Sequence, residues 1–389
     1  MPEAIIASAV RTPIGTAFKG TLTETTAEEL ATHVLREAVR RSGLAPERFD
    51  DVAFGETLYG GGDLARYAAV AAGMIQVPGV ALNRHCASSL TAIAMASGSI
   101  RSGMDRAVVA GGVHSSSTGP ALTWKFANAD GSARKTPPTF PYTDDATDDV
   151  TLTTGWNLAV RYGLSREQID AWALRSHQRA VAATAAGTFA DEIAPIKVTK
   201  ADGSVVEFAA DEHPRSNTSA EKLAALKPLH PEIEGFSITA GNASGSNDGA
   251  AALAVVAADL AREEGLTPLA TVRAWAAVGV EPKYTGVGAV DAAAKVLGRA
   301  GLTVADIDLW EINEAWATVP IVACQELGLD DERVNIYGSG CSLGHPVAAT
   351  GARMVTTLIH ELRRRGGGTG LATMCAGGGQ GGALIIEVS

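Results

Sequence analysis

Cys86 has the clearest catalytic potential in the chain, because it stands directly before an apolar stretch. Residues 87–100, fourteen in all, carry no charge. Four apolar residues in this stretch recur at helical spacing, namely Leu90, Ile93, Ala96 and Ile100. Because small residues occupy the other faces, we predict a helix that is buried all round, with Cys86 at its start. The unpaired N–H groups of a helix N-terminus favour a thiolate, so we predict a pKa for Cys86 below the usual value of about 8.5.

Three segments far downstream hold groups that could complete a catalytic site. They are Asn313 after the strand-like residues 307–310, His345 between two turn-forming residues, and Cys375 in a glycine-rich stretch before a strand. Each has a plainer interpretation when taken alone: a helix cap for Asn313, a loop position for His345, and a core thiol for Cys375. Cys86, taken alone, could also be a core thiol. Together they offer a nucleophile, a base and an acid. We expect surface or structural roles for five other histidines: His85, His114, His177, His213 and His230.

Alternating strand and helix signals predict an α/β protein with more than one domain. Residues 239–256 and 373–388 both read as a glycine-rich turn followed by an apolar strand, which indicates two halves of related architecture. The stretch from about residue 115 to residue 234 differs, with a proline-rich run at 135–141, an acidic run at 144–149, and a long helix that Ser165 and Gln168 should cap. We therefore predict an N-terminal half at 1–114 and 235–265, an inserted lid domain at 115–234, and a C-terminal half at 266–389.

Composition restricts the function classes. The net charge of −11 argues against nucleic acid or an anionic membrane as a partner. The four cysteines lack the spacing of a disulfide framework or a C-x-x-C zinc site; a metal site from Cys341, His345 and Cys375 is conceivable, but thiolate chemistry explains the same residues. Glycine runs at 366–368 and 377–379 lack the ending of a nucleotide-binding P-loop. The first residues read as a strand rather than a secretion signal, so we expect a soluble cytoplasmic protein.

Along essentially its whole length the chain resembles the thiolases, which cleave or form 3-oxoacyl-CoA thioesters. Besides the segments around Cys86, Asn313, His345 and Cys375, the resemblance rests on VRTPIG at 10–15, VAGG at 109–112, LSREQID at 164–170, ALRSHQRA at 173–180 and TAGNASGSNDG at 239–249. It implies the thiolase fold: two βαβαβαββ halves stacked as five αβαβα layers, with an inserted lid. It also implies an acyltransferase of fatty acid metabolism that acts as a homodimer or homotetramer.

The resemblance also implies roles for individual residues. Cys86 would carry the acyl group, and His345, a residue type whose pKa lies near neutrality, would take its proton. Cys375 would protonate the departing enolate or abstract the α-proton of acetyl-CoA. One oxyanion site would be His345 with a water held by Asn313, and the other would be the backbone N–H groups of Cys86 and Gly377. CoA would be a co-substrate and no cofactor would be bound covalently. Ser244 would lie beside the pantetheine arm of CoA, and Arg215 near its nucleotide end.

Several residues depart from the common thiolase pattern near the expected acyl group. They are Ser89, His114, Val150 and Thr151 in place of a His-Met pair, His230, Thr285 and Trp316. Thr151 and Thr285 stand at positions where methionine is common. Their smaller side chains predict a pocket for 3-oxoacyl groups larger than acetoacetyl, although the ring of Trp316 could refill the space. A biosynthetic acetoacetyl-CoA thiolase and another Cys-dependent condensing enzyme stay open as alternatives. Ketoacyl synthases, however, use His-His or His-Asn partners instead of a second cysteine, and a non-catalytic acyl-CoA binder would not need the retained thiols.

Overall fold

The computed structural model describes residues 3–57, 59, 61–122, 124, 125, 127, 131, 139–141, 147 and 149–389. Its strands are β1 (Ala4–Arg11), β2 (Gly15–Thr16), β3 (Asp51–Gly55), β4 (Gly79–Leu82), β5 (Ala107–His114), β6 (Ile196–Thr199), β7 (Val205–Phe208), β8 (Asn247–Ala257), β9 (Ala270–Gly279), β10 (Leu309–Ile312), β11 (Gly368–Ala376) and β12 (Gln380–Val388). In the described residues, the main sheet runs in the order β10-β11-β12-β9-β1-β8-β5-β3-β4, with β2 paired to β8. The sheet is mixed: β10 pairs with β11, and β3 with β4 and β5, in parallel, whereas the pairs from β11 through to β5 are antiparallel.

The helices form layers on and between two parts of this sheet. They are α1 (Ala27–Ser42), α2 (Leu64–Ala71), α3 (Ser88–Ser102), α4 (Asn157–Arg161), α5 (Arg166–Ala185), α6 (Ala220–Ala224), α7 (Ala258–Glu263), α8 (Gly288–Ala300), α9 (Thr318–Leu327), α10 (Gly340–Leu343) and α11 (Thr350–Arg364). Short 3₁₀ turns lie at Pro46–Arg48, Pro282–Val287, Val304–Asp306 and Asp331–Arg333, and a π-helical turn at Thr151–Trp156. Within the described residues, no helix is long and apolar enough to cross a membrane.

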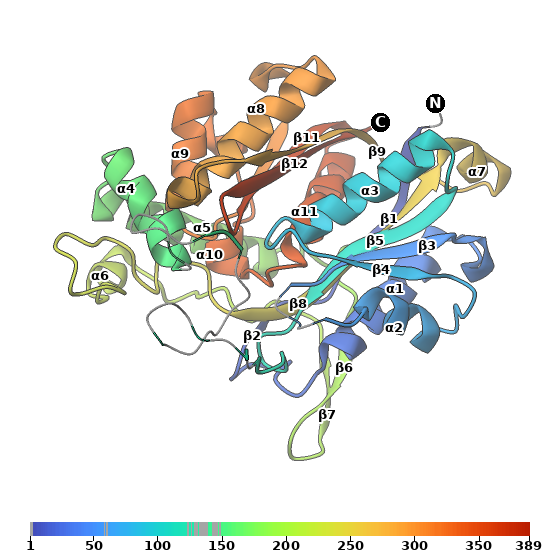
Figure 1. Cartoon of the computed structure of the whole chain (residues 1–389), viewed down its shortest axis with the longest axis horizontal. Coiled ribbons are helices and arrows are strands. Elements are labelled where there is room, and N and C mark those ends of the chain that lie inside the picture. Colours follow the sequence, from blue (N-terminus) through green and yellow to red (C-terminus); the bar gives the residue numbers. More distant parts are fainter. Residues whose placement is uncertain are drawn as a thin grey trace.

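The predicted five-layered αβαβα fold is confirmed. Helices α3 and α11 lie in the middle layer, because α11 contacts both β8 and β11, and α3 contacts both β5 and β12. Helix α1 covers the outer face of the N-terminal strands and α8 covers the outer face of the C-terminal strands (Figure 1). Each strand predicted from an apolar run is present: the first at β1, the run after residue 250 in β8, and the C-terminal run in β12.

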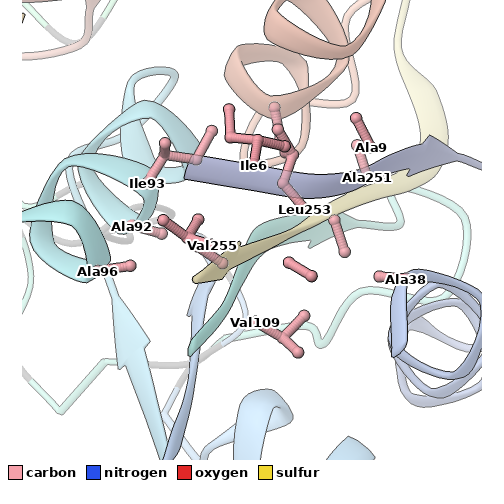
Figure 2. Packing of buried hydrophobic residues seen from close by; sticks show 14 of the residues in the cluster. Ile6, Ala9, Ala38, Ala92, Ile93, Ala96, Val109, Ala251, Leu253 and Val255 are labelled. Carbon is pink, nitrogen blue, oxygen red and sulfur yellow. The ribbon is translucent and has the colours of Figure 1, made fainter. Parts of the chain in front are cut away.

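The core around β8 explains why these runs are so rich in alanine. Every residue of β8 is buried, and Figure 2 shows Ala92 and Ile93 of α3 beside it, with Ala38 of α1 approaching from the other side. Alanine and valine side chains keep the layers close, and burial of their methyl groups contributes roughly 25 cal/mol for each Å² of apolar surface removed from water. The sheet is therefore a rigid support for the loops at the ends of its strands.

The prediction for the helix after Cys86 is partly wrong. The helix begins at Ser88, with Ala87 as its N-cap, so Cys86 lies two residues before it. Met95 is half exposed, and Ser102 is exposed as well, so one side of the helix is not buried. The two parts of the main sheet cover only those faces of α3 that point toward them. An apolar pattern predicts which faces can be buried, but it does not say whether a neighbour covers them.

The inserted segment is tied to the N-terminal half by a buried ion pair. Arg11, at the end of β1, donates to Glu192 at 2.6 Å and to Asp211 at 2.7 Å. The long helix predicted after Ser165 is present as α5, with the predicted capping box between Ser165 and Gln168. The proline-rich run at 135–141 and the acidic run at 144–149 lie largely outside the described residues, and the proposed domain boundaries stay a prediction.

Candidate active site

One cavity of about 370 Å³ brings together most of the predicted site residues. Cys86, Ser244, His345, Cys375 and Gly377 all line it. They come from the loop before α3, the loop before β8, the loop after α10, the end of β11 and the turn into β12. These positions are spread over nearly three hundred residues of sequence. The fold therefore assembles the thiol, the imidazole and the second thiol at one place.

The environment of Cys86 differs from the one predicted. Burial raises the pKa of the Cys86 thiol to about 11, while the backbone N–H groups of Gly377 and of Cys86 itself, directed at the sulfur, act in the opposite direction. The prediction of a lowered pKa is therefore wrong for this state of the protein. The pKa is raised for two reasons. The helix begins two residues after Cys86, so its dipole acts less on the sulfur, and burial disfavours the thiolate more than the two N–H groups favour it.

Cys375 lies at the end of β11 and is buried. Burial raises the pKa of its thiol, and the neighbouring Cys86 raises it further. This second effect means that the two sulfurs are close enough for a charge on one to disfavour a charge on the other. Only one of the two thiols is therefore expected to be ionised at a time.

His345 is held in a single tautomer by its neighbours. Its Nδ1 lies 2.7 Å from Thr350 Oγ1, and that hydroxyl donates to the carbonyl of Pro346 at 2.9 Å. Because a hydroxyl carries one proton, Thr350 accepts a hydrogen bond from Nδ1–H, and the lone pair is left on Nε2. The loop geometry depends on Gly344, whose φ of 102° favours glycine and where a Cβ would lie 2.6 Å from Asn247. His345 can thus act as a base through Nε2.

The charge state of His345 also differs from the expectation. Burial, with smaller contributions from nearby His114 and Arg353, lowers the pKa of His345 to about 3. The imidazole is therefore neutral at physiological pH, rather than poised near neutrality as the residue type suggested. A neutral imidazole beside a neutral thiol accepts the proton as the sulfur forms its bond to carbon, so that no buried ion pair has to exist beforehand.

Asn313 lies beside the His345 ring, with its Nδ2 3.4 Å from Nε2. It is completely buried, and in the described part of the chain its Oδ1 has no hydrogen-bond partner. Buried polar atoms are nearly always bonded to protein or water, so this oxygen suits the predicted water. The next residue, Glu314, fixes the loop: its carboxylate accepts from Trp172 at 2.9 Å and from Asn335 at 2.9 Å.

The two predicted CoA contacts lie in different places. Ser244 lines the cavity, half-buried, and its N–H donates to the carbonyl of Ala315 at 2.9 Å. Arg215 is exposed and does not line the cavity. Its backbone N–H donates to His177 Nδ1 at 3.2 Å. The structure therefore brings Ser244, and not Arg215, to the reacting groups.

Two histidines that we expected to be structural line the cavity: His85 and His114. His85 has a left-handed backbone, with φ of 45°, immediately before Cys86. Such strain in a non-glycine residue is common at functional sites. Its place next to Cys86 was the signal that could have identified it. His177 and His213, in contrast, are buried away from the cavity, and burial lowers the pKa of each to about 4.

The other departures from the common pattern are spread around the cavity and beyond it. Val150, Thr285 and Trp316 line it, whereas Thr151 does not. His230 lies outside the lining and pairs with Asp149 at 2.9 Å and with Glu232 at 2.8 Å. Buried Ser89 accepts from the N–H of Ala352 at 2.9 Å and so joins α3 to α11.

The alternative metal set is not assembled. Cys341 does not line the cavity, and its thiol is directed at the carbonyl of Glu314, 3.5 Å away. In the residues that the structure covers, no group of three or more His, Cys, Asp or Glu side chains is arranged to hold a metal ion.

The raised pKa of Cys86 predicts how its alkylation should depend on pH. With a thiol pKa of about 11, the thiolate fraction is small at pH 7 and should rise about tenfold for each pH unit up to pH 9. We expect the rate of alkylation by iodoacetamide, followed by mass spectrometry of the Cys86 peptide, to rise in the same way. A rate that is constant from pH 7 to 9 would mean that a thiolate already exists in the resting protein.

Comparison with known proteins agrees with the arrangement of these groups. Residues 4–259 match the family model of the thiolase N-terminal domain, and residues 266–388 match that of the thiolase C-terminal domain. Acetyl-CoA acetyltransferase of Cupriavidus necator is 39% identical over 100% of both chains. Beta-ketoadipyl-CoA thiolase of Pseudomonas aeruginosa is 43% identical over 99% of both. The crystal structure of the Bacillus anthracis acetyl-CoA acetyltransferase superposes with a TM-score of 0.92 at 41% identity, covering 100% of this chain and 99% of the other. The chain belongs to the thiolase family and is an acyltransferase.

Proposed function

We propose that the protein catalyses CoA-dependent thiolysis of 3-oxoacyl-CoA to acetyl-CoA and a shortened acyl-CoA, and the reverse Claisen condensation, through an acyl-enzyme on Cys86. The observation that carries this proposal is the convergence of Cys86, His345 and Cys375 on one cavity, with two backbone N–H groups directed at the Cys86 sulfur. Fatty acid metabolism and a cytoplasmic location stay predictions from the sequence.

The first half-reaction transfers the acyl group to the protein. The Cys86 proton passes to His345 Nε2 while the sulfur attacks the 3-oxo carbon. The bond between that carbon and Cα then breaks, and Cys375 protonates the enolate of acetyl-CoA as it departs. In the second half-reaction, the Cys375 thiolate takes the proton of CoA, CoA attacks the acyl group, and His345 returns its proton to the Cys86 sulfur. Protons and bonds balance over the cycle.

Carbonyl oxygens gain negative charge in both half-reactions, so the cavity needs donors for two oxyanions. The N–H groups of Cys86 and Gly377 are directed at the sulfur and would donate to the carbonyl oxygen of the acyl group that the sulfur carries. The buried Asn313 amide beside His345 supports the second site, in which a water would complete the donor set. Ser244, which lines the cavity, would contact the pantetheine arm of CoA. The exposed Arg215 would contact the nucleotide end of CoA.

The second candidate is a biosynthetic acetoacetyl-CoA thiolase. The names of relatives such as the Cupriavidus necator protein favour it, because they specify acetyl-CoA acetyltransferase. The cavity wall supports the larger substrate instead: Val150 and Thr285 line it at positions where a histidine and a methionine, respectively, are common in that class.

Thiolytic kcat/KM along a series of 3-oxoacyl-CoA thioesters of increasing length separates the two candidates. We expect the maximum at a chain longer than acetoacetyl, with each methylene worth roughly 1 to 3 kcal/mol of discrimination. Thr285→Met should shift the maximum toward acetoacetyl-CoA, whereas the matched control Thr151→Met, which makes the same change off the cavity, should not. A sharp maximum at acetoacetyl-CoA in the unchanged protein would overturn the larger-pocket proposal.

We also propose that the protein acts as a homodimer or homotetramer. Strand β4 ends the main sheet path, and α2 and α3 both contact it. Around this edge Tyr67, Ile75, Val80 and Met95 are between 37% and 62% exposed. An open strand edge with exposed apolar side chains favours association. Sedimentation equilibrium should give a multiple of 39.9 kDa, and a monomer at micromolar concentration would contradict the proposal.

A further inference from the structure

One end of the cavity is built by the ends of β3 and β5, next to the reacting groups. These strands pair in parallel, with Gly55 opposite Gly112, and Thr57 and His114 follow each glycine by two residues. A Cβ on Gly55 would lie 2.6 Å from Ser88 Cβ, and one on Gly112 would lie 2.1 Å from the carbonyl oxygen of Ala348. The strand ends therefore press against the residues that follow Cys86 and His345, and the side chains beyond them border the cavity.

Thr57 carries an unused hydrogen-bonding group in this wall. Thr57 is 4% exposed, and its Oγ1 has no hydrogen-bond partner in the described chain. The other polar groups here are occupied: a ring N–H of His114 donates to the carbonyl of Thr57, and His114 Nε2 lies 3.2 Å from Ser116 Oγ. Trp316 Nε1, on another part of the lining, is also buried without a partner. A buried unpaired donor is unfavourable, so such groups suit a site that a ligand completes.

The part of the wall that the described residues form is polar but carries no Lys, Arg, Asp or Glu. Burial lowers the pKa of His114 to about 4, so this imidazole is neutral at physiological pH. Among these described residues, an acyl chain that ends in a carboxylate would find no counter-charge, and burial of an unpaired carboxylate is strongly unfavourable. A neutral oxygen could accept from or donate to the Thr57 hydroxyl at little cost.

We propose that Thr57 is a specificity-determining residue that selects acyl groups carrying a neutral hydroxyl or keto oxygen over alkyl chains and over carboxylate-ended chains. The proposal rests on the thiolase function and names the substrate class of that site. It differs from a preference for length alone, because it depends on one oxygen atom in the substrate and one in the protein.

The test compares primers that differ by one group in condensation with acetyl-CoA. The pairs are glycolyl- and propionyl-CoA, 3-hydroxypropionyl- and butyryl-CoA, and 4-hydroxybutyryl- and valeryl-CoA, in which a terminal CH₃ replaces OH; succinyl-CoA supplies the carboxylate. We expect the hydroxylated primer to exceed its alkyl partner about tenfold in kcat/KM for at least one pair, the upper end of what one additional hydrogen bond usually contributes. Succinyl-CoA should be the poorest primer.

Three variants locate the effect. Thr57→Val keeps the shape and should bring the favoured ratio close to one, whereas Thr57→Ser should retain it. Thr318→Val makes the same change at another buried, unpaired hydroxyl that lies off the cavity, so it should leave the ratio unchanged. Ratios of one or less for every pair, a ratio unaffected by Thr57→Val, or succinyl-CoA as the best primer would overturn the proposal. Failure of the thiolase function itself is distinguishable, because no primer, alkyl ones included, would then be condensed.

Discussion

Replacing Cys86 by serine is expected to abolish acylation and to lower kcat by about 10⁴-fold or more, the scale of loss seen when an enzyme loses its nucleophile. A serine hydroxyl is a far weaker acid than a thiol, and the neutral His345, whose pKa is lowered to about 3, cannot remove its proton to a useful extent. The N–H groups directed at the sulfur would remain. The measurement is steady-state thiolysis together with the intact mass of the protein after brief exposure to acyl-CoA.

Cys324→Ser is the matched control for that variant. Cys324 lies in α9 and does not line the cavity, so the same chemical change there should leave both turnover and acylation intact. Retained acylation in Cys86→Ser would show that another group carries the acyl chain.

Cys375→Ser should separate the two half-reactions. Because Cys86 remains, the protein should still be acylated, but the exchange of acetyl-CoA α-hydrogens and the condensation should fall by about 10² to 10⁴, the usual worth of a general acid or base. The structure supplies the reason for keeping the two roles on two thiols. The pKa of each is raised by burial, and that of Cys375 is raised further by Cys86.

Deuterium exchange into acetyl-CoA in heavy water, measured beside the acylated fraction of the protein, gives both quantities in one sample. If Cys375→Ser loses acylation and exchange to the same extent, the assigned division of labour between the thiols is wrong.

Local patterns in the sequence were sufficient for much of the fold. The capping box at Ser165 and Gln168 fixed the start of α5, and apolar runs fixed β1, β8 and β12, because these features depend on neighbours in sequence. The order of layers and the gathering of Cys86, His345 and Cys375 followed from the resemblance to thiolases, since no local pattern says which strand ends meet.

Properties that depend on burial could not be predicted in this way. The thiol of Cys86, although partly exposed at the cavity, and the imidazole of His345 both favour their neutral forms because packing of the two halves takes these groups largely out of bulk water. Thr57 and His114 reach the cavity through the parallel register of β3 with β5, which the sequence does not contain. Thr350, which fixes the tautomer of His345, is recognisable only from its 2.7 Å contact.

The central claim is that the acyl group is carried by Cys86, and its most direct test is to find that group. The protein would be exposed briefly to an acyl-CoA, which acylates the protein without cleavage of a carbon–carbon bond, then quenched in acid, digested and analysed by mass spectrometry. The account predicts one added acyl mass on the peptide that contains Cys86, absent from Cys86→Ser and present in Cys375→Ser. An acyl mass on the peptide that contains Cys375, or none on any cysteine while turnover proceeds, would contradict it.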